Sequence, residues 1–297
     1  MTGRMGTAVT FREPASCHEF PENAYAIEVQ PHTMKLQTFE KFKRLIYEKS
    51  GITLGPQKVT LVSSRIAKRM RILNIQEHEA YFRYVVADTS SDELVHLIDS
   101  ISTNVTSFFR EPAHFDVLTE LIHRWDIRNK PQFRIWCAAS STGEEPYCLA
   151  ITVLEALGGH HRDFRLLATD ISTRVLETAK AGEYPANKIE AVPRAIRDKY
   201  FTRSGPAMYR IRDDVRQLIS FSRLNLSEPP FPMRGPLDVV FCRNVMIYFD
   251  NAVRTRLLQD IHRLLKPGGY LMIGHSENLT GLGVPFKVEK PAVYVRT

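Results

Sequence analysis

The chain of 297 residues has no apolar run that approaches the ~18 consecutive residues of a membrane span. Its first 30 residues also lack the apolar core of a secretory signal peptide. Residues 1–32 carry Gly, Pro, Thr, Glu and His without periodicity, which predicts a mobile N-terminal tail. These absences argue against an integral membrane protein, and we expect a cytoplasmic protein without membrane insertion.

Cysteine is scarce, and no two cysteines have the spacing of a metal-binding pair. The chain has Cys17, Cys137, Cys148 and Cys242. The last three lie in apolar segments, which is typical of buried reduced thiols in a cytosolic protein. No third ligand stands at a convincing spacing from His275 or from the His160-His161 pair, so we expect no metal site.

The Gly-x-Gly-x-x-Gly signature of dinucleotide-binding folds is also missing, which disfavours hydride chemistry with NAD. Instead, residues 133–147 predict a buried strand, a turn of small residues around Gly143 and the start of a helix. Residues 166–170 predict a second buried strand that ends on Asp170. Small residues let the backbone approach a ligand, and the acid can accept hydrogen bonds from ribose hydroxyls. The pattern predicts a cleft for an adenosine-containing cofactor, although Asp170 could instead cap the following helix.

Length and composition allow one large domain and one small domain, since 43% of the residues are hydrophobic. The formal net charge of +7 is compatible with nucleic acid, an anionic membrane surface or an acidic protein partner. Charge alone does not decide between these partners.

A purely helical pattern extends from about Gln37 to Asn104. Gly51 is placed to end the first helix. The predicted helices are 38–49, 57–73, 77–86 and 91–102. We therefore expect a small all-helical domain over residues 33–103.

Strands and helices alternate after Pro112, which predicts a doubly wound α/β domain with a mainly parallel sheet over residues 104–297. Predicted strands are 134–138, 164–169, 239–242 and 270–273, and predicted helices are 113–124, 145–157, 173–181 and 252–265. Proline and two glycines between Leu265 and Tyr270 predict a sharp corner from helix to strand. Residues 286–296 predict a hairpin that closes the sheet edge.

The alternation breaks between about residues 185 and 225. Residues 209–212 and 218–224 alternate between apolar and polar side chains with period two. This pattern predicts a small antiparallel β insertion.

Motifs after the helical part carry a family resemblance. They are Thr103–Arg110, Ser141–Tyr147, Phe241–Phe249 and Gly274–Asn278. In combination and order they resemble the bacterial chemotaxis receptor methyltransferases, the CheR family, from about Thr38 to the C-terminus. The resemblance implies a Rossmann-like class I methyltransferase domain. It also implies transfer of a methyl group from S-adenosylmethionine to glutamate side chains of chemoreceptors, with S-adenosylhomocysteine as product and no metal.

The same resemblance implies roles for individual residues. Arg110 and Tyr248 are expected closest to the reacting groups, as catalytic residues. The implied cofactor contacts are Asn104, Thr106, Arg110, Glu145, Asp170, Asn225, Leu226, Arg243 and Asn244.

Each implied role has a structural alternative. Arg110 could be an exposed residue at a helix start, and Glu145 an acid favoured by the helix dipole. Arg243 and Asn244 could simply end a strand, and Tyr248 could belong to the core.

The helix predicted over residues 57–73 carries an apolar stripe and a basic side. The basic residues are Lys58, Arg65, Lys68 and Arg69. They could be a solvated face, and no aromatic residues interleave with them as nucleic-acid binding would require. With the family resemblance, they imply docking to the Glu- and Gln-rich helical bundle of chemoreceptors. Reversal of Arg65 and Arg69 to Glu is then expected to raise the apparent KM for receptor and leave cofactor binding unchanged.

Some family members grip a receptor's C-terminal pentapeptide with a loop of the β insertion. Here the corresponding region, residues 201–210, is shortened, so we expect a pentapeptide-independent enzyme. Separately, we expect a monomer. Two alternatives stay open: a cofactor-binding signalling module of the same fold without turnover, and a methyltransferase for another substrate.

Overall fold

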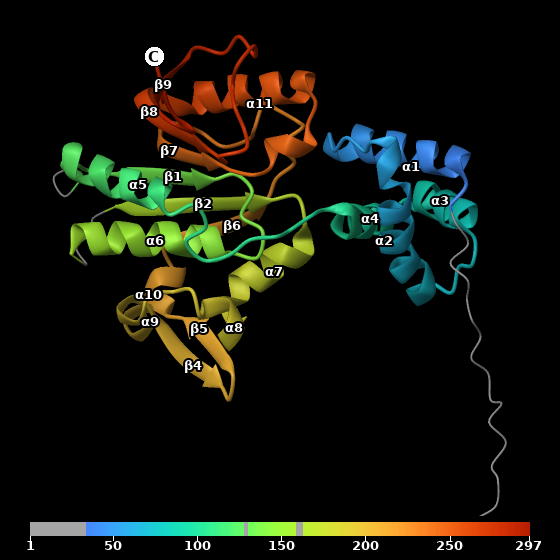
Figure 1. The fold of residues 1–297 in the computed structure, drawn as a ribbon, viewed down its shortest axis with the longest axis horizontal. Coiled ribbons are helices and arrows are strands. Elements are labelled where there is room, and N and C mark those ends of the chain that lie inside the picture. The colour runs from blue at the N-terminus through green and yellow to red at the C-terminus, as the bar shows by residue number, and fades with distance from the viewer. Residues whose placement is uncertain (1–33, 128–129, 159–162) are drawn as a thin grey trace, which may run out of the picture. The chain divides into compact units, whose positions relative to one another are not determined.

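The computed structural model describes residues 34–127, 130–158 and 163–297 (Figure 1). Contacts divide the chain into Met1–His32 and Thr33–Thr297, and every described residue belongs to the second unit. The expected N-terminal tail, Cys17 and the His160-His161 pair lie outside the described residues. No helix among the described residues is long and apolar enough to cross a membrane.

The N-terminal part is helical, as predicted. Its elements are α1 (Leu36–Ser50), the 3-10 turn η1 (Pro56–Lys58), α2 (Val59–Ile72), α3 (His78–Ala87) and α4 (Asp92–Ile101). Gly51 ends α1 in the left-handed conformation, and its N–H donates to the Tyr47 carbonyl. Phe39, Phe42, Ile66 and Leu97 are fully buried in one core shared by these helices. The apolar residues that recur at helical spacing in the sequence are the ones that form this core.

A seven-stranded sheet forms the centre of the remaining chain, in the order β6-β2-β1-β7-β8-β10-β9. Its strands are β1 (Phe133–Cys137), β2 (Phe164–Asp170), β6 (Ile219–Arg223), β7 (Leu237–Cys242), β8 (Leu265–Ile273), β9 (Phe286–Lys290) and β10 (Val293–Arg296). The neighbours from β6 to β8 pair in parallel, whereas β10 pairs antiparallel with β8 and β9. The predicted C-terminal hairpin is therefore confirmed at one edge of the sheet.

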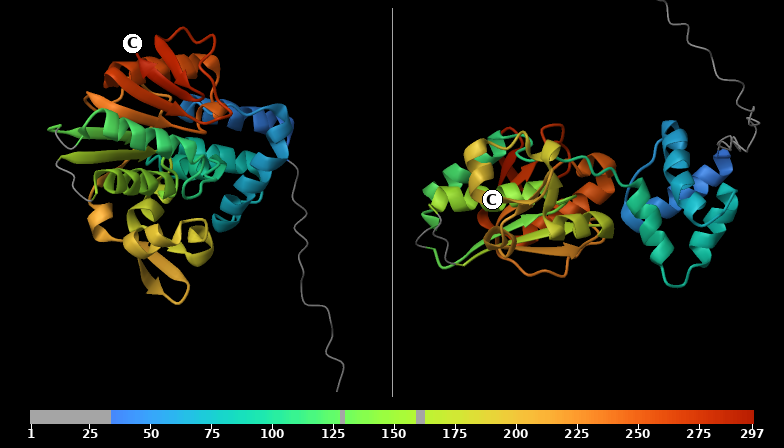
Figure 2. Two further views of the ribbon diagram at one scale, coloured as in Figure 1. Left: turned by 60° about the vertical axis from the view of Figure 1, so that its left-hand side comes forward. Right: turned by 90° about the horizontal axis from the view of Figure 1, so that it is seen from below.

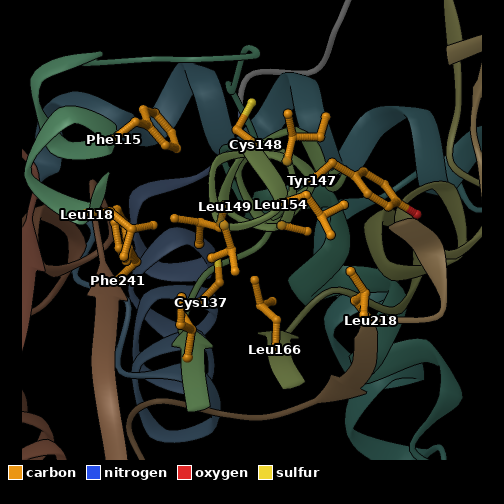
Figure 3. Packing of buried hydrophobic residues seen from close by; sticks show 14 of the residues in the cluster. Phe115, Leu118, Cys137, Tyr147, Cys148, Leu149, Leu154, Leu166, Leu218 and Phe241 are labelled. Atoms are coloured by element: carbon orange, nitrogen blue, oxygen red, sulfur yellow. The ribbon is translucent and has the colours of Figure 1, made fainter. Parts of the chain in front are cut away.

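Both faces of the sheet are covered by helices. Helices α5 (Ala113–Arg124) and α6 (Glu144–Leu157) cover one face and α11 (Asn251–Leu264) the other (Figure 1). Side chains of β1 point alternately to the two faces of the sheet, so Ile135 and Cys137 lie in one buried cluster and Trp136 lies in the other. Figure 3 shows Leu149 over Cys137, and Phe115 on the side of Phe241, on the first face. The doubly wound, Rossmann-like sheet predicted from the sequence is thus confirmed.

The insertion contains a three-stranded antiparallel sheet in the order β3-β5-β4. Its strands are β3 (Glu183–Pro185), β4 (Phe201–Gly205) and β5 (Met208–Ile211), and the short helices α8 (Ala186–Ile189), α9 (Arg194–Tyr200) and α10 (Asp213–Arg216) accompany them. In Figure 1 and the left view of Figure 2, this sheet and α11 lie at opposite ends of the α/β part.

The expectation that residues 218–224 belong to the insertion is wrong. They form β6, which pairs in parallel with β2 at the edge of the main sheet. An edge strand with one exposed face also alternates with period two, so the pattern cannot distinguish the two placements.

The corner after α11 also differs from the prediction. Helix α11 ends at Leu264 and β8 begins at once, without an intervening loop. Gly268 has a positive φ of 72°, and the pairing of β8 with β7 shifts register between Leu237 and Val239. The glycines therefore let the extra residues bulge within the strand instead of forming a separate turn.

Candidate functional site

A cleft opens at the carboxyl ends of β1, β2 and β7 and is also lined by the helical part. Its empty space is about 1230 Å³, including solvent at the mouth. Every residue predicted as a catalytic or cofactor contact lines it: Asn104, Thr106, Arg110, Glu145, Asp170, Asn225, Leu226, Arg243, Asn244 and Tyr248. Such a position is the usual ligand site of open α/β sheets.

The turn between β1 and α6 lies against Asp170 at the end of β2. The backbone N–H groups of Ser141 and Ser172 donate to the Asp170 carboxylate at 2.9 and 3.0 Å. Burial raises the pKa of Asp170, and these N–H donors oppose the rise. The alternative that Asp170 caps the next helix, α7 (Thr173–Ala181), is wrong because Ser172 is its N-cap. Asp170 is therefore an oriented acid at the wall of the cleft.

Arg243, which follows β7, holds the centre of a buried ionic network. Its side chain is 1% exposed, with Nη1 2.5 Å from Glu145 Oε2 and Nη2 2.9 Å from Glu111 Oε2. Nη2 also donates to the Arg110 carbonyl at 2.7 Å. Arg243 therefore ties the linker, α6 and β7 together, rather than merely ending a strand.

The two carboxylates of this network differ in protonation tendency. Burial raises the pKa of Glu145, although the positive charge of Arg243 opposes the rise. Burial also acts to raise the pKa of Glu111, but hydrogen bonding and charge from Arg243 outweigh it and the pKa is lowered. Glu145 also accepts a hydrogen bond from the Cys137 thiol at 3.3 Å. It stands in the first turn of α6, as the helix-dipole alternative expected, and it is also a partly buried ion-pair partner.

Glu277 stabilises the wall around Asn244, and it was missed from the sequence. Its carboxylate accepts from the backbone N–H groups of Asn244, Met246 and Gly274 at 2.9, 2.8 and 2.6 Å. These bonds connect the ends of β7 and β8 and hold Asn244 at a positive φ of 57°. An acid shortly after an apolar strand, within the Gly274–Asn278 motif, was the available signal.

The linker between α4 and α5 forms another wall. The Ser141 hydroxyl donates to the Asn104 carbonyl at 3.1 Å, and the Arg110 guanidinium donates to the Val105 carbonyl at 3.1 Å. The Asn104 side-chain nitrogen is buried without a hydrogen-bond partner in the described part of the chain. A buried donor of this kind in a cleft fits a polar ligand.

The helical part contacts the cleft through the segment that follows α1. Both the N–H and the hydroxyl of Thr53 donate to the Tyr248 carbonyl, at 2.8 and 2.9 Å. Tyr248 is half-buried at the cleft and is not a fully buried core residue. The Asn225 side chain donates to the Lys49 carbonyl and accepts from Ser227, so its own polar groups are engaged within the protein. Its backbone carbonyl accepts from the Glu228 N–H, and Asn225 and Leu226 both line the cleft.

The four residues predicted to dock a partner do not share one free surface. Arg69 forms a two-pronged ion pair with the buried Glu93, and Arg65 donates to the Ile101 carbonyl and to Thr103. Long arginine side chains reach the neighbouring α4, which helical phasing alone does not reveal. Lys58 and Lys68 are exposed, and Lys58 also lines the cleft.

The expected effect of reversing Arg65 and Arg69 therefore needs correction. Arg65 holds the linker that lines the cleft, and Arg69 neutralises a carboxylate that is 5% exposed. Their reversal would disturb the fold and the cleft together, so it does not isolate docking.

Buried thiols were predicted correctly. Cys137, Cys148 and Cys242 are buried and free.

Comparison with known proteins identifies relatives over most of the chain. Residues 37–102 match the family described as CheR methyltransferase, all-alpha domain, and residues 104–295 match CheR methyltransferase, SAM binding domain. The chain is 40% identical to chemotaxis protein methyltransferase 2 of Pseudomonas aeruginosa over 82% of its length and 86% of the relative. It is 38% identical to the chemotaxis protein methyltransferases of Salmonella typhimurium and Klebsiella aerogenes, over 86% of its length and 88% of each relative.

Proposed function

Since the chain belongs to the CheR methyltransferase family and is an S-adenosylmethionine-dependent methyltransferase, we propose that it methylates glutamate side chains of bacterial chemoreceptors. The product would be a γ-carboxyl methyl ester, formed in the cytoplasm on the receptor's helical bundle. The observation that carries the proposal is the convergence of the predicted contact residues on one cleft around Asp170 and Arg243.

We assign the cofactor contacts by position in the cleft. Asp170 would accept hydrogen bonds from the ribose hydroxyls, because its carboxylate stands at the carboxyl end of β2. Leu226 and the backbone of Asn225 would contact the adenine. The Arg243 network and the free Asn104 amide would surround the methionine end.

The reaction requires orientation more than acid–base chemistry. Bound S-adenosylmethionine supplies a methyl group already activated on a sulfonium. A glutamate carboxylate is an anion at neutral pH, so no general base is needed. Alignment of this kind can contribute about 7–11 kcal/mol to lowering the barrier.

We assign Arg110 and Tyr248 to orienting the carboxylate, because both line the cleft, from the linker and from the turn after β7. Thr53 supports Tyr248 through the two hydrogen bonds to its carbonyl. An arginine held tightly on the nucleophile would stabilise its ground state, so a positioning role fits Arg110 better than a clamp.

The direct test is transfer of labelled methyl groups to chemoreceptors in membranes. We expect base-labile label on a receptor-sized band, released as methanol, because a carboxyl methyl ester hydrolyses in mild base. Receptors with and without a C-terminal pentapeptide should be labelled equally well, since only residues 206–207 separate β4 from β5. Base-stable label would exclude ester chemistry, and cofactor binding without label would favour a binding module or another substrate.

The variant Tyr248→Phe refines this experiment. It should keep its affinity for S-adenosylhomocysteine and methylate receptor more slowly. A wild-type rate with unchanged cofactor affinity would overturn the role assigned to Tyr248.

A second prediction concerns docking through exposed cations of α2. The double variant Lys68→Glu, Arg71→Glu should raise the apparent KM for receptor on the order of tenfold at low salt, with a smaller effect at high salt. Both side chains are exposed, and neither contacts the cleft. Cofactor affinity should not change. The matched control is Lys180→Glu, Lys287→Glu, which makes the same charge change at exposed positions on other elements.

If the control raises KM as much as the α2 variant, net charge and not α2 governs the encounter.

A further inference from the structure

Three potential metal ligands from distant parts of the chain meet beside the Arg243 network. They are Glu111 in the linker, His114 in the first turn of α5 and His275 after β8. One ligand atom from each lies within 4.8 Å of the others. No local spacing could reveal this set, because His275 follows His114 by 161 positions (275 − 114).

His114 is the unusual member of the set. Its side chain is 1% exposed, yet neither ring nitrogen has a hydrogen-bond partner among the described residues. Glu111 Oε2 lies 3.4 Å from its Nδ1, and the centroids of the His114 and His275 rings are 4.9 Å apart. Buried polar groups are normally paired, so an unpaired imidazole here calls for a ligand.

We propose that Glu111, His114 and His275 form a binding site for a divalent transition-metal ion of the zinc type. Two imidazoles and one carboxylate are a donor set that zinc takes, with water in the fourth position. Ligands about 2.1 Å from a tetrahedral ion lie about 3.4 Å apart, which is the separation of His114 and Glu111. The exposed His275 side chain can close the remaining distance and leaves an entry path from solvent.

The site is coupled to the cleft through Glu111. The oxygen that faces His114, Glu111 Oε2, already pairs with Arg243 at 2.9 Å and accepts a hydrogen bond from the backbone N–H of His275 at 3.3 Å. A metal ion and the Arg243 guanidinium would therefore compete for one carboxylate. Metal binding should weaken cofactor binding, and by linkage the cofactor should weaken metal binding by the same factor. The ion has an inhibitory role here and takes no part in methyl transfer.

The test is titration of the full chain, without an affinity tag, with Zn²⁺ by calorimetry. The protein used carries His160→Ala and His161→Ala. These changes remove two histidines that are consecutive in the sequence and could bind the ion by themselves. We expect one ion per chain, and His275→Ala should weaken binding by at least about tenfold. Its matched control, His96→Ala, replaces an exposed histidine on α4 and should have no effect.

Co²⁺ provides a second readout, since a tetrahedral site with nitrogen ligands gives visible absorption that His275→Ala should abolish. His114→Gln should also abolish this absorption. Binding of S-adenosylhomocysteine by His114→Gln in metal-free buffer would show that the variant is folded. Absence of Zn²⁺ binding, or equal binding by His275→Ala, would overturn the site.

The competition is measured separately, as the affinity for S-adenosylhomocysteine with and without Zn²⁺. It rests on the proposed cofactor role of Arg243, whereas the metal titration does not. A fall in cofactor affinity that His275→Ala removes supports the coupling. Zinc bound through His275 with unchanged cofactor affinity supports the site and overturns its coupling to Arg243.

Discussion

Replacement of Arg243 by methionine is expected to destabilise the protein by about 3–5 kcal/mol and to abolish cofactor binding. The guanidinium is 1% exposed and lies between Glu145 and Glu111, whose side chains are 13% and 15% exposed. Its removal leaves two largely buried carboxylates without their cation. The free energy of unfolding from urea denaturation and calorimetry with S-adenosylhomocysteine measure the two effects.

The double variant Arg243→Met, Glu145→Gln separates stability from binding. Glutamine occupies nearly the same volume as glutamate and removes one uncompensated charge, so part of the lost stability should return. Cofactor binding should not return, because the cation is still missing from the cleft. Arg243→Met with wild-type stability would contradict the ionic network, and restored binding in the double variant would contradict the assigned role of Arg243.

Gly143→Ala is expected to have the second large effect, a loss of about 2–4 kcal/mol of stability. Gly143 has a φ of 98°, and an added Cβ would lie 2.7 Å from the Tyr184 hydroxyl and 2.9 Å from Ala179 Cβ. The Tyr184 hydroxyl donates to the Thr142 carbonyl at 2.7 Å, so its displacement would also release the turn beside Asp170. Cofactor affinity should fall together with stability.

A glycine in open space provides the control for Gly143. Gly281 has a φ of 77°, and nothing lies within 4 Å of its added Cβ. Gly281→Ala should therefore lower the free energy of unfolding only through the unfavourable backbone conformation, by about 1 kcal/mol. The difference between the two variants, measured by urea denaturation, isolates the close approach around Gly143. Equal losses would show that backbone conformation alone explains the effect.

Features that depend on residues close together in the sequence could be predicted from it. Hydrophobic periods of 3.6 and 2 predicted the α1 to α4 helices and the main strands, because each side chain of such an element faces a fixed layer. Gly51 was recognised as a helix end, since a left-handed residue favours glycine. The motifs around Gly143, Asp170 and Arg243 were all found, and the fold brings them to one cleft.

Features that depend on which strand or helix becomes a neighbour could not be predicted. The alternating residues of β6 suit an edge position in either sheet, and only pairing with β2 decided between them. Arg65 and Arg69 had the phase of a solvated face, but α4 supplies their partners.

The sequence by itself determined the helical and α/β parts and the motif residues that meet in the cleft, because local periodicity and short motifs carry that information. Only the tertiary structure decided the partners of the buried charges. Glu111 pairs with Arg243 across 132 positions (243 − 111), and Glu277 holds the backbone at Asn244. A buried charge must find a compensating group wherever the fold brings one, so its partner is a property of packing and not of spacing.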